Sequence, residues 1–218
     1  MSSFDRLGHA LIELGKAVVV AAVEPRKSTF RVRSGQVGAV TKTLRSLAHD
    51  ELRSFASPKG RDNFLWATAN YLAPLDHEEL IVAFGTRRGR ARGAGAALRR
   101  VHRSVGVRDR VSLTPSLLTL LDAELRRDGA EIVLVHNHPP NALKSAIGNV
   151  LGWRPIASAQ DRNLATAFLE SRVGHLLSSE RPSSLKWYLV DEGEVGEFVL
   201  PTLDVLLSWT KHAVQPRP

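Results

Sequence analysis

The stretch EIVLVHNHP, residues 131–139, is an apolar run that leads into two histidines and a proline. Side chains alternate between the faces of a strand, so a strand over residues 132–138 would put His136 and His138 on one face, where two imidazoles can share a metal ion. Pro139 cannot continue the ladder, which predicts the histidines at the strand's end, where open α/β sheets place their sites. Asp161, which closes the later stretch SAQD at residues 158–161, is the expected third ligand.

Composition limits which class of protein this can be and which kind of metal site it can have. The chain has 218 residues, of which 43% are hydrophobic, enough for one domain of ordinary size or a core domain with an extra piece. There is no cysteine, which excludes disulfides and thiolate zinc sites, so a metal would be held by His, Asp, Glu and water. The apolar run at residues 17–23 is too short to span a membrane, and we expect a cytoplasmic protein.

The charge of the chain favours an acidic partner. The formal net charge is +8 and the pI is near 10.4. Residues 85–95 (GTRRGRARGAG) are too polar and flexible for a core, and they predict either a hairpin loop or a nucleic-acid contact. A basic solvated surface without nucleic-acid binding is the alternative. The arginines of a nucleic-acid contact would be Arg87, Arg88, Arg90 and Arg92.

Hydrophobic periodicity and turn signals divide the chain into helices and strands. Helices are expected over residues 3–22, 40–55, 64–72, 114–129, 159–170 and 203–209, with a further short one possible within 143–151. Strands are expected over 79–84, 96–105, 132–138, 173–177, 186–190 and 195–200, with a short edge strand within 28–38. A strand, a helix and a strand in succession around Thr114 to His138 indicate a layered fold that mixes helices with a sheet.

The histidine pair, followed by Ser158 and Asp161, resembles the JAMM motif of the JAB/MPN metalloprotease superfamily, and within it the bacterial RadC-like branch. The resemblance covers about residues 57–200. It also includes the flanking positions Ser57-Pro58, His77-Glu78-Glu79, Gly106 and Thr114-Pro115.

The resemblance implies an α+β fold with α/β/α layers, in which helices flank a mixed sheet. The JAB/MPN-like domain would occupy residues 57–210, after a helical N-terminal extension at 1–56 and before a flexible tail at 211–218. It implies Zn²⁺ held by His136, His138 and Asp161 with water as the fourth ligand, a geometry that leaves one position open for chemistry.

The resemblance also implies an activity. The family hydrolyses peptide or isopeptide bonds, including those of ubiquitin-like proteins, and its serine, which steadies the oxyanion, corresponds to Ser158. His175 would be a second-shell group, because the RadC-like branch has a histidine on the corresponding strand; a histidine satisfied in the core or at an edge is the alternative. The branch is linked by name to DNA repair.

Two features depart from the family. The interval from His138 to Ser158 is longer by about a dozen residues, an insertion whose loop-closure cost is small. The family's general-base glutamate has no counterpart, since Val101 stands at its position with His102 beside it. His102 could replace it, Glu78 or Glu79 could reach the water, or the domain could be a pseudo-enzyme that acts as a DNA-associated or scaffolding protein.

Overall fold

The structure, a computed structural model, describes residues 26–27, 34–55, 61–86, 97–108, 110–139, 179–191 and 194–198, with positions 161, 164, 167, 168 and 175. The expected elements at 3–22, 143–151 and 203–209, the tail, Ser158 and the four arginines between 87 and 92 lie outside these residues. None of the helices in the described ranges is long and apolar enough to cross a membrane.

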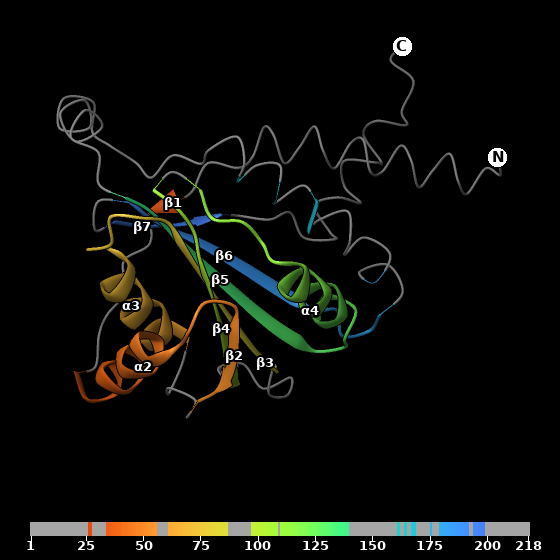
Figure 1. The fold of residues 1–218 in the computed structure, drawn as a ribbon. Coiled ribbons are helices and arrows are strands. Elements are labelled where there is room, and N and C mark those ends of the chain that lie inside the picture. Colours follow the sequence, from red (N-terminus) through yellow and green to blue (C-terminus); the bar gives the residue numbers. More distant parts are fainter. Residues whose placement is uncertain are drawn as a thin grey trace, which may run out of the picture.

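One mixed sheet organises the described chain (Figure 1). Its order is β1-β7-β6-β5-β3-β4-β2, and all neighbours are antiparallel except β5 and β6. Parallel neighbours need a crossover connection, so residues 139–183 return from one end of the sheet to the other. The strands are β1 (Arg26–Lys27), β2 (Glu51–Ser54), β3 (Glu79–Thr86), β4 (Ala97–Val105), β5 (Ala130–His138), β6 (Ser184–Asp191) and β7 (Glu194–Phe198).

Helices cover both faces of this sheet. The helix α4 (Pro115–Leu125) lies on one face, and α2 (Ser34–Ser46) and α3 (Arg61–Leu72) lie on the other (Figure 1). Each face has its own apolar cluster, one with Leu117 and Leu121 of α4, the other with Leu44 of α2 and Phe64 of α3. The expected α+β class, a mixed sheet flanked by helices, is confirmed.

The apolar run that ends in the histidines is the central strand β5. All nine of its residues are buried, because β3 and β6 pair with its two edges and helices cover both faces. Ile132 and Leu134 belong to the α4 face, whereas Val133 and Val135 belong to the α2 and α3 face. The predicted alternation is therefore confirmed, and β5 ends immediately before Pro139.

The predicted helix start at Thr114-Pro115 is also confirmed. Thr114 caps α4, its hydroxyl accepting a hydrogen bond from the backbone N–H of Leu117 at 3.3 Å, and Pro115 occupies the first turn. The helix ends at Leu125, and Gly129, with a φ of 66°, turns the chain into β5.

Two predicted elements differ from the structure. The helix expected over residues 40–55 ends at Ser46, and β2 follows, because Asp50 turns the chain with a φ of 58° and β2 then pairs with β4. Residues 34–38 begin α2, and the rest of the segment 28–38, in which a short edge strand is expected, lies outside the described residues. His175, expected on a strand, is helical, and its carbonyl accepts from Ser179 N at 3.0 Å; a short apolar run does not distinguish the two periods.

The expected division after residue 56 does not separate two packing units. Within the supposed extension, β2 is a strand of the sheet, and Val40, Leu44 and Leu47 share an apolar cluster with α3. Residues 34–54 therefore complete the domain that carries the histidines.

Candidate metal centre

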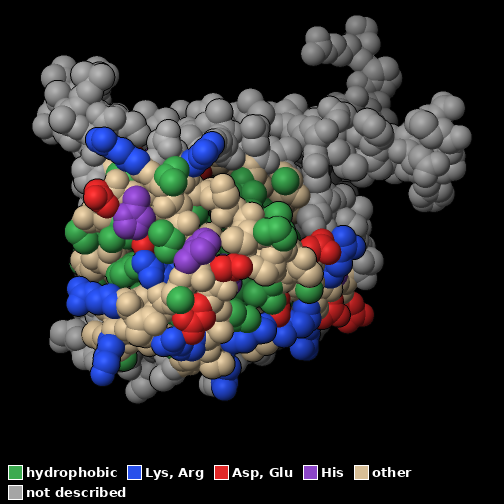
Figure 2. Space-filling model, viewed as in Figure 1, with side chains coloured by type: hydrophobic (Ala, Val, Ile, Leu, Met, Phe, Trp, Pro, Cys, Tyr) green, Lys and Arg blue, Asp and Glu red, His purple; other side chains and the backbone are tan. Residues whose placement is uncertain are grey.

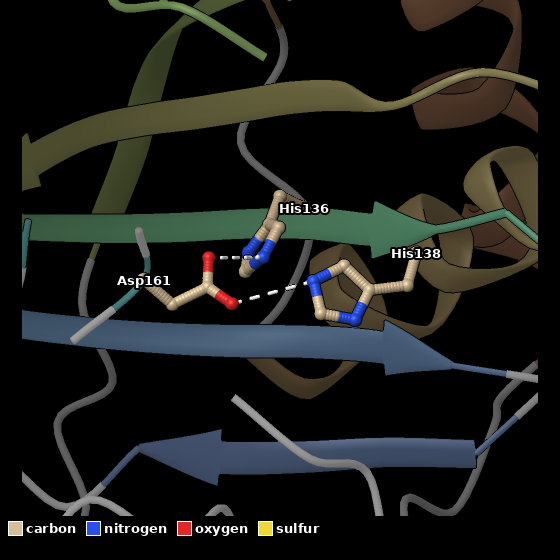
Figure 3. Close-up of side chains that lie close together, drawn as sticks. All are labelled: His136, His138 and Asp161. Carbon is tan, nitrogen blue, oxygen red and sulfur yellow. Dashed lines mark ion pairs between the residues drawn. The ribbon is translucent and has the colours of Figure 1, made fainter. Parts of the chain in front are cut away.

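The two histidines of β5 share a face, as the alternation predicted, and a carboxylate lies against both. Nε2 of His136 is 2.9 Å from Oδ1 of Asp161, and Nε2 of His138 is 3.3 Å from Oδ2 (Figure 3). Asp161 is helical and belongs to the crossover that follows β5. All three residues are buried, and one ligand atom from each lies within 4.8 Å of the other two.

Asp161 is held as a carboxylate. Burial alone would raise the pKa of its carboxyl group, but the charges and hydrogen bonds of His136 and His138 together lower it well below its ordinary value. An ionised carboxylate is therefore available as a ligand near neutral pH.

The ligand set fits a metal ion in composition and in size. Zinc bonds of about 2.0–2.2 Å at tetrahedral angles separate ligand atoms by about 3.3–3.5 Å. The 3.3 Å between His138 and Asp161 matches this spacing, whereas the 2.9 Å between His136 and Asp161 is shorter and has the length of a hydrogen bond. One contact runs against the usual arrangement. Trp187 Nε1 donates a hydrogen bond to Nδ1 of His136 at 2.9 Å, whereas metal-binding histidines ordinarily donate from their second nitrogen.

A cavity of about 370 Å³ opens beside the cluster and is lined by His136 and Asp161. Two charged residues, Glu78 and Arg110, also line it, and most of the remaining lining residues are apolar. The cluster thus has an open side on which a small reacting group could sit. The apolar part of the wall consists of Leu80, Val111, Leu113, Leu118, Leu164 and Trp187.

Asn137, the residue between the two histidines, points to the opposite face and fixes the start of β3. Its Oδ1 accepts from Glu79 N at 2.8 Å, and its Nδ2 donates to His77 O at 3.0 Å. Leu80 pairs with His136, so the same register, continued outward, brings Glu78 level with His138. From the other side, Glu78 N donates to Val107 O at 2.9 Å.

The neighbouring glutamate has a different role. Glu79 is buried on the α3 face, where it accepts hydrogen bonds from both Arg103 and Tyr71 and contacts His77 at 2.8 Å. Burial would raise the pKa of Glu79, but Arg103, His77 and Tyr71 together hold it below its ordinary value. Of the two glutamates predicted as substitutes for the missing base, the structure therefore brings only Glu78 to the cavity.

His102, the other predicted substitute, is engaged elsewhere. Its Nε2 lies 2.8 Å from Oδ1 of Asp50, which also accepts from Thr114 and Ser116. Hydrogen bonds from Thr114 and Ser116, and a weaker one from His102, lower the pKa of Asp50 to about 2. The strand β3 lies between β4 and β5, which separates their backbones by about 10 Å. The structure does not bring His102 to the ligand cluster, and it is not among the described residues that line the cavity.

His175, a further predicted contribution, lies apart from the cluster. His175 Nε2 is 3.5 Å from Asp128, just before the start of β5, whereas the ligands lie at its end. On the face drawn in Figure 2, lysine and arginine side chains are interspersed with aspartate and glutamate. The arginine-rich segment proposed for nucleic-acid contact lies outside the described residues.

Comparisons with known proteins found no match: no protein-family model, no curated protein and no solved structure matches the chain. The geometry of the site therefore carries the functional argument.

Proposed function

We propose that the protein is a zinc-dependent hydrolase of peptide or isopeptide bonds, with a JAB/MPN-like fold in which His136, His138 and Asp161 hold the metal. The observation that carries this proposal is the cavity, because two of the three candidate ligands line it together with Glu78. Bound zinc would lower the pKa of a water molecule and polarise an amide carbonyl.

In this proposal Glu78 is the general base, in place of the glutamate that has no counterpart at Val101. A carboxylate on the cavity wall can take a proton from water and return it to the departing amine. The backbone bonds on both sides of Glu78 limit its movement, and such preorganisation favours proton transfer. The apolar wall and Arg110 would bind the substrate on either side of the bond that is cleaved.

The metal is tested first, on protein purified without chelators. Elemental analysis should find near-stoichiometric zinc, and Asp161→Asn should remove most of it. Two histidines and one carboxylate also suit non-haem iron, so iron in place of zinc would contradict the proposal. If the protein contains no zinc and added zinc does not bind, the metal centre itself is excluded.

Catalysis is tested with a panel of peptides and ubiquitin-like fusion proteins. Glu78→Gln keeps the size of the side chain but cannot take a proton, so turnover should fall by roughly 10²–10⁴ while zinc content is unchanged. His102→Gln is the matched control and should retain turnover per folded, zinc-loaded molecule. A zinc-loaded wild type that cleaves nothing in the panel would favour the pseudo-enzyme alternative.

A further inference from the structure

The contact between Trp187 and His136 defines which imidazole nitrogen carries a proton. Trp187 lies on β6, which pairs with β5, and both side chains are almost wholly buried, with 1% and 2% exposure. The indole N–H can only donate, so Nδ1 of His136, 2.9 Å away, must accept with its lone pair.

A neutral His136 must therefore carry its proton on Nε2. That nitrogen lies 2.9 Å from Oδ1 of Asp161, whose carboxylate attracts the proton. Turning the ring over would put carbon atoms at both contacts, so the two neighbours fix its orientation as well. The imidazole is thus held between an indole donor on one side and a carboxylate on the other.

This arrangement competes with a metal ion for the same nitrogen. A metal bound at Nε2 displaces the proton, and in a neutral imidazole the proton then resides on Nδ1. Two N–H donors, those of Nδ1 and the Trp187 indole, would face each other across 2.9 Å in a buried site. Metal-binding histidines ordinarily direct this N–H at a carboxylate or a carbonyl oxygen.

We propose that Trp187 is a positioning residue that holds His136 in the tautomer unable to bind metal through Nε2, so that metal loading requires the indole to give up its hydrogen bond. The inference rests on the metal site of the proposed function but not on its catalytic activity. The site would then have two stable forms, a hydrogen-bonded form without metal and a loaded form with a displaced indole, and Trp187 would lower its affinity for metal.

The first experiment compares metal affinities by titrating apo protein with zinc near neutral pH. Trp187→Phe removes the opposing donor and keeps an aromatic ring, so zinc should bind roughly tenfold more tightly or better. Trp66→Phe is the matched control, because Trp66 is half-buried on α3, on the far side of the sheet, and affinity should be unchanged. Equal or weaker zinc binding by Trp187→Phe overturns the inference.

The second experiment needs no variant. Long-range ¹⁵N–¹H spectra of the wild type at about pH 8 should show His136 protonated on Nε2 without metal and on Nδ1 after zinc is added, with a shift of the Trp187 indole resonance. An Nδ1-protonated His136 in the metal-free protein overturns the inference.

The outcomes separate the two proposals. Zinc binding that is strengthened in Trp187→Phe, without cleavage of any substrate, supports the inference and contradicts the hydrolase. Cleavage with equal affinities contradicts only the inference. Zinc binding by neither protein contradicts both.

Discussion

Asn137 ties the histidine strand to Glu78 by bonding the backbone on both sides of it, at the N–H of Glu79 and the carbonyl of His77. The residue between the two candidate ligands thus acts on the opposite face of the sheet, and it fixes the backbone of a glutamate that lines the cavity.

Asn137→Ala should loosen Glu78 without removing a ligand. The buried Glu79 N–H loses its partner, which costs about 1–3 kcal/mol in the free energy of unfolding. We expect kcat to fall while zinc affinity changes little, as measured by turnover and zinc titration of the same preparation. Asn137→Asp, which can still accept from Glu79 N, should be milder. A loss of zinc affinity as large as the loss of kcat would show that Asn137 supports the ligands instead.

Gly106→Ala should disturb the other side of Glu78. A Cβ at Gly106 would stand 2.3 Å from Arg110 O and 2.8 Å from Glu78 O, both backbone atoms, and we expect a cost of about 1–3 kcal/mol or more. Gly38→Ala is the comparison, since nothing lies within 4 Å of its Cβ and an alanine in α2 should stabilise by about 0.5–1 kcal/mol. Urea unfolding measures both. If Gly106→Ala lost no stability relative to Gly38→Ala, the close packing at Gly106 would be contradicted.

Arg103 should be needed for the stability of the fold as long as Glu79 is present. Glu79 is fully buried, and Arg103 donates to both of its carboxylate oxygens, so Arg103→Met should cost about 3–5 kcal/mol by leaving a buried charge poorly compensated. The double variant Glu79→Met with Arg103→Met should recover most of this loss. Chemical unfolding of the four proteins gives the coupling energy, and additive losses would contradict a buried ion pair.

His102 should make the fold sensitive to mild acid. Burial, only partly opposed by Asp50, lowers the pKa of His102 below its model-peptide value of 6.5. The unfolded chain therefore takes up this proton first, and stability is lost as pH falls from about 6.5 toward the lower folded-state pKa. His102→Gln should lose less stability than the wild type between pH 7.5 and 5.5 in urea unfolding. Parallel losses in the two proteins would exclude this contribution.

The parts of the site predicted from the sequence are those that depend on local alternation. The shared face of His136 and His138 follows from the period of two in a strand, and the cap at Thr114 follows from local chemistry. The role of Trp187 could not be predicted, because it depends on the parallel register that pairs β6 with β5 across a long crossover. Which of Glu78 and Glu79 reaches the cavity could not be predicted either, since only their places in the sheet assign them to different faces.

The wrong prediction of a helix up to residue 55 also has a physical cause. The sequence predicts helix over residues 47–55 because Leu44, Leu47 and Leu52 fit a helical period. A turn at a non-glycine residue with positive φ gives little warning in sequence, and Asp50 is stabilised there by hydrogen bonds from Thr114 and Ser116, far along the chain.

The single parallel pair in the sheet has a consequence for the order of folding. His136 and Asp161 are joined by the crossover that β5 and β6 require, whereas the other strand pairs of the described sheet are antiparallel. Closing such a loop is entropically costly and slow, so the three ligands should come together late, after the hairpin of β3 and β4. A metal ion would then act mainly on the native side of the folding barrier, prolonging the lifetime of the folded protein without hastening its formation.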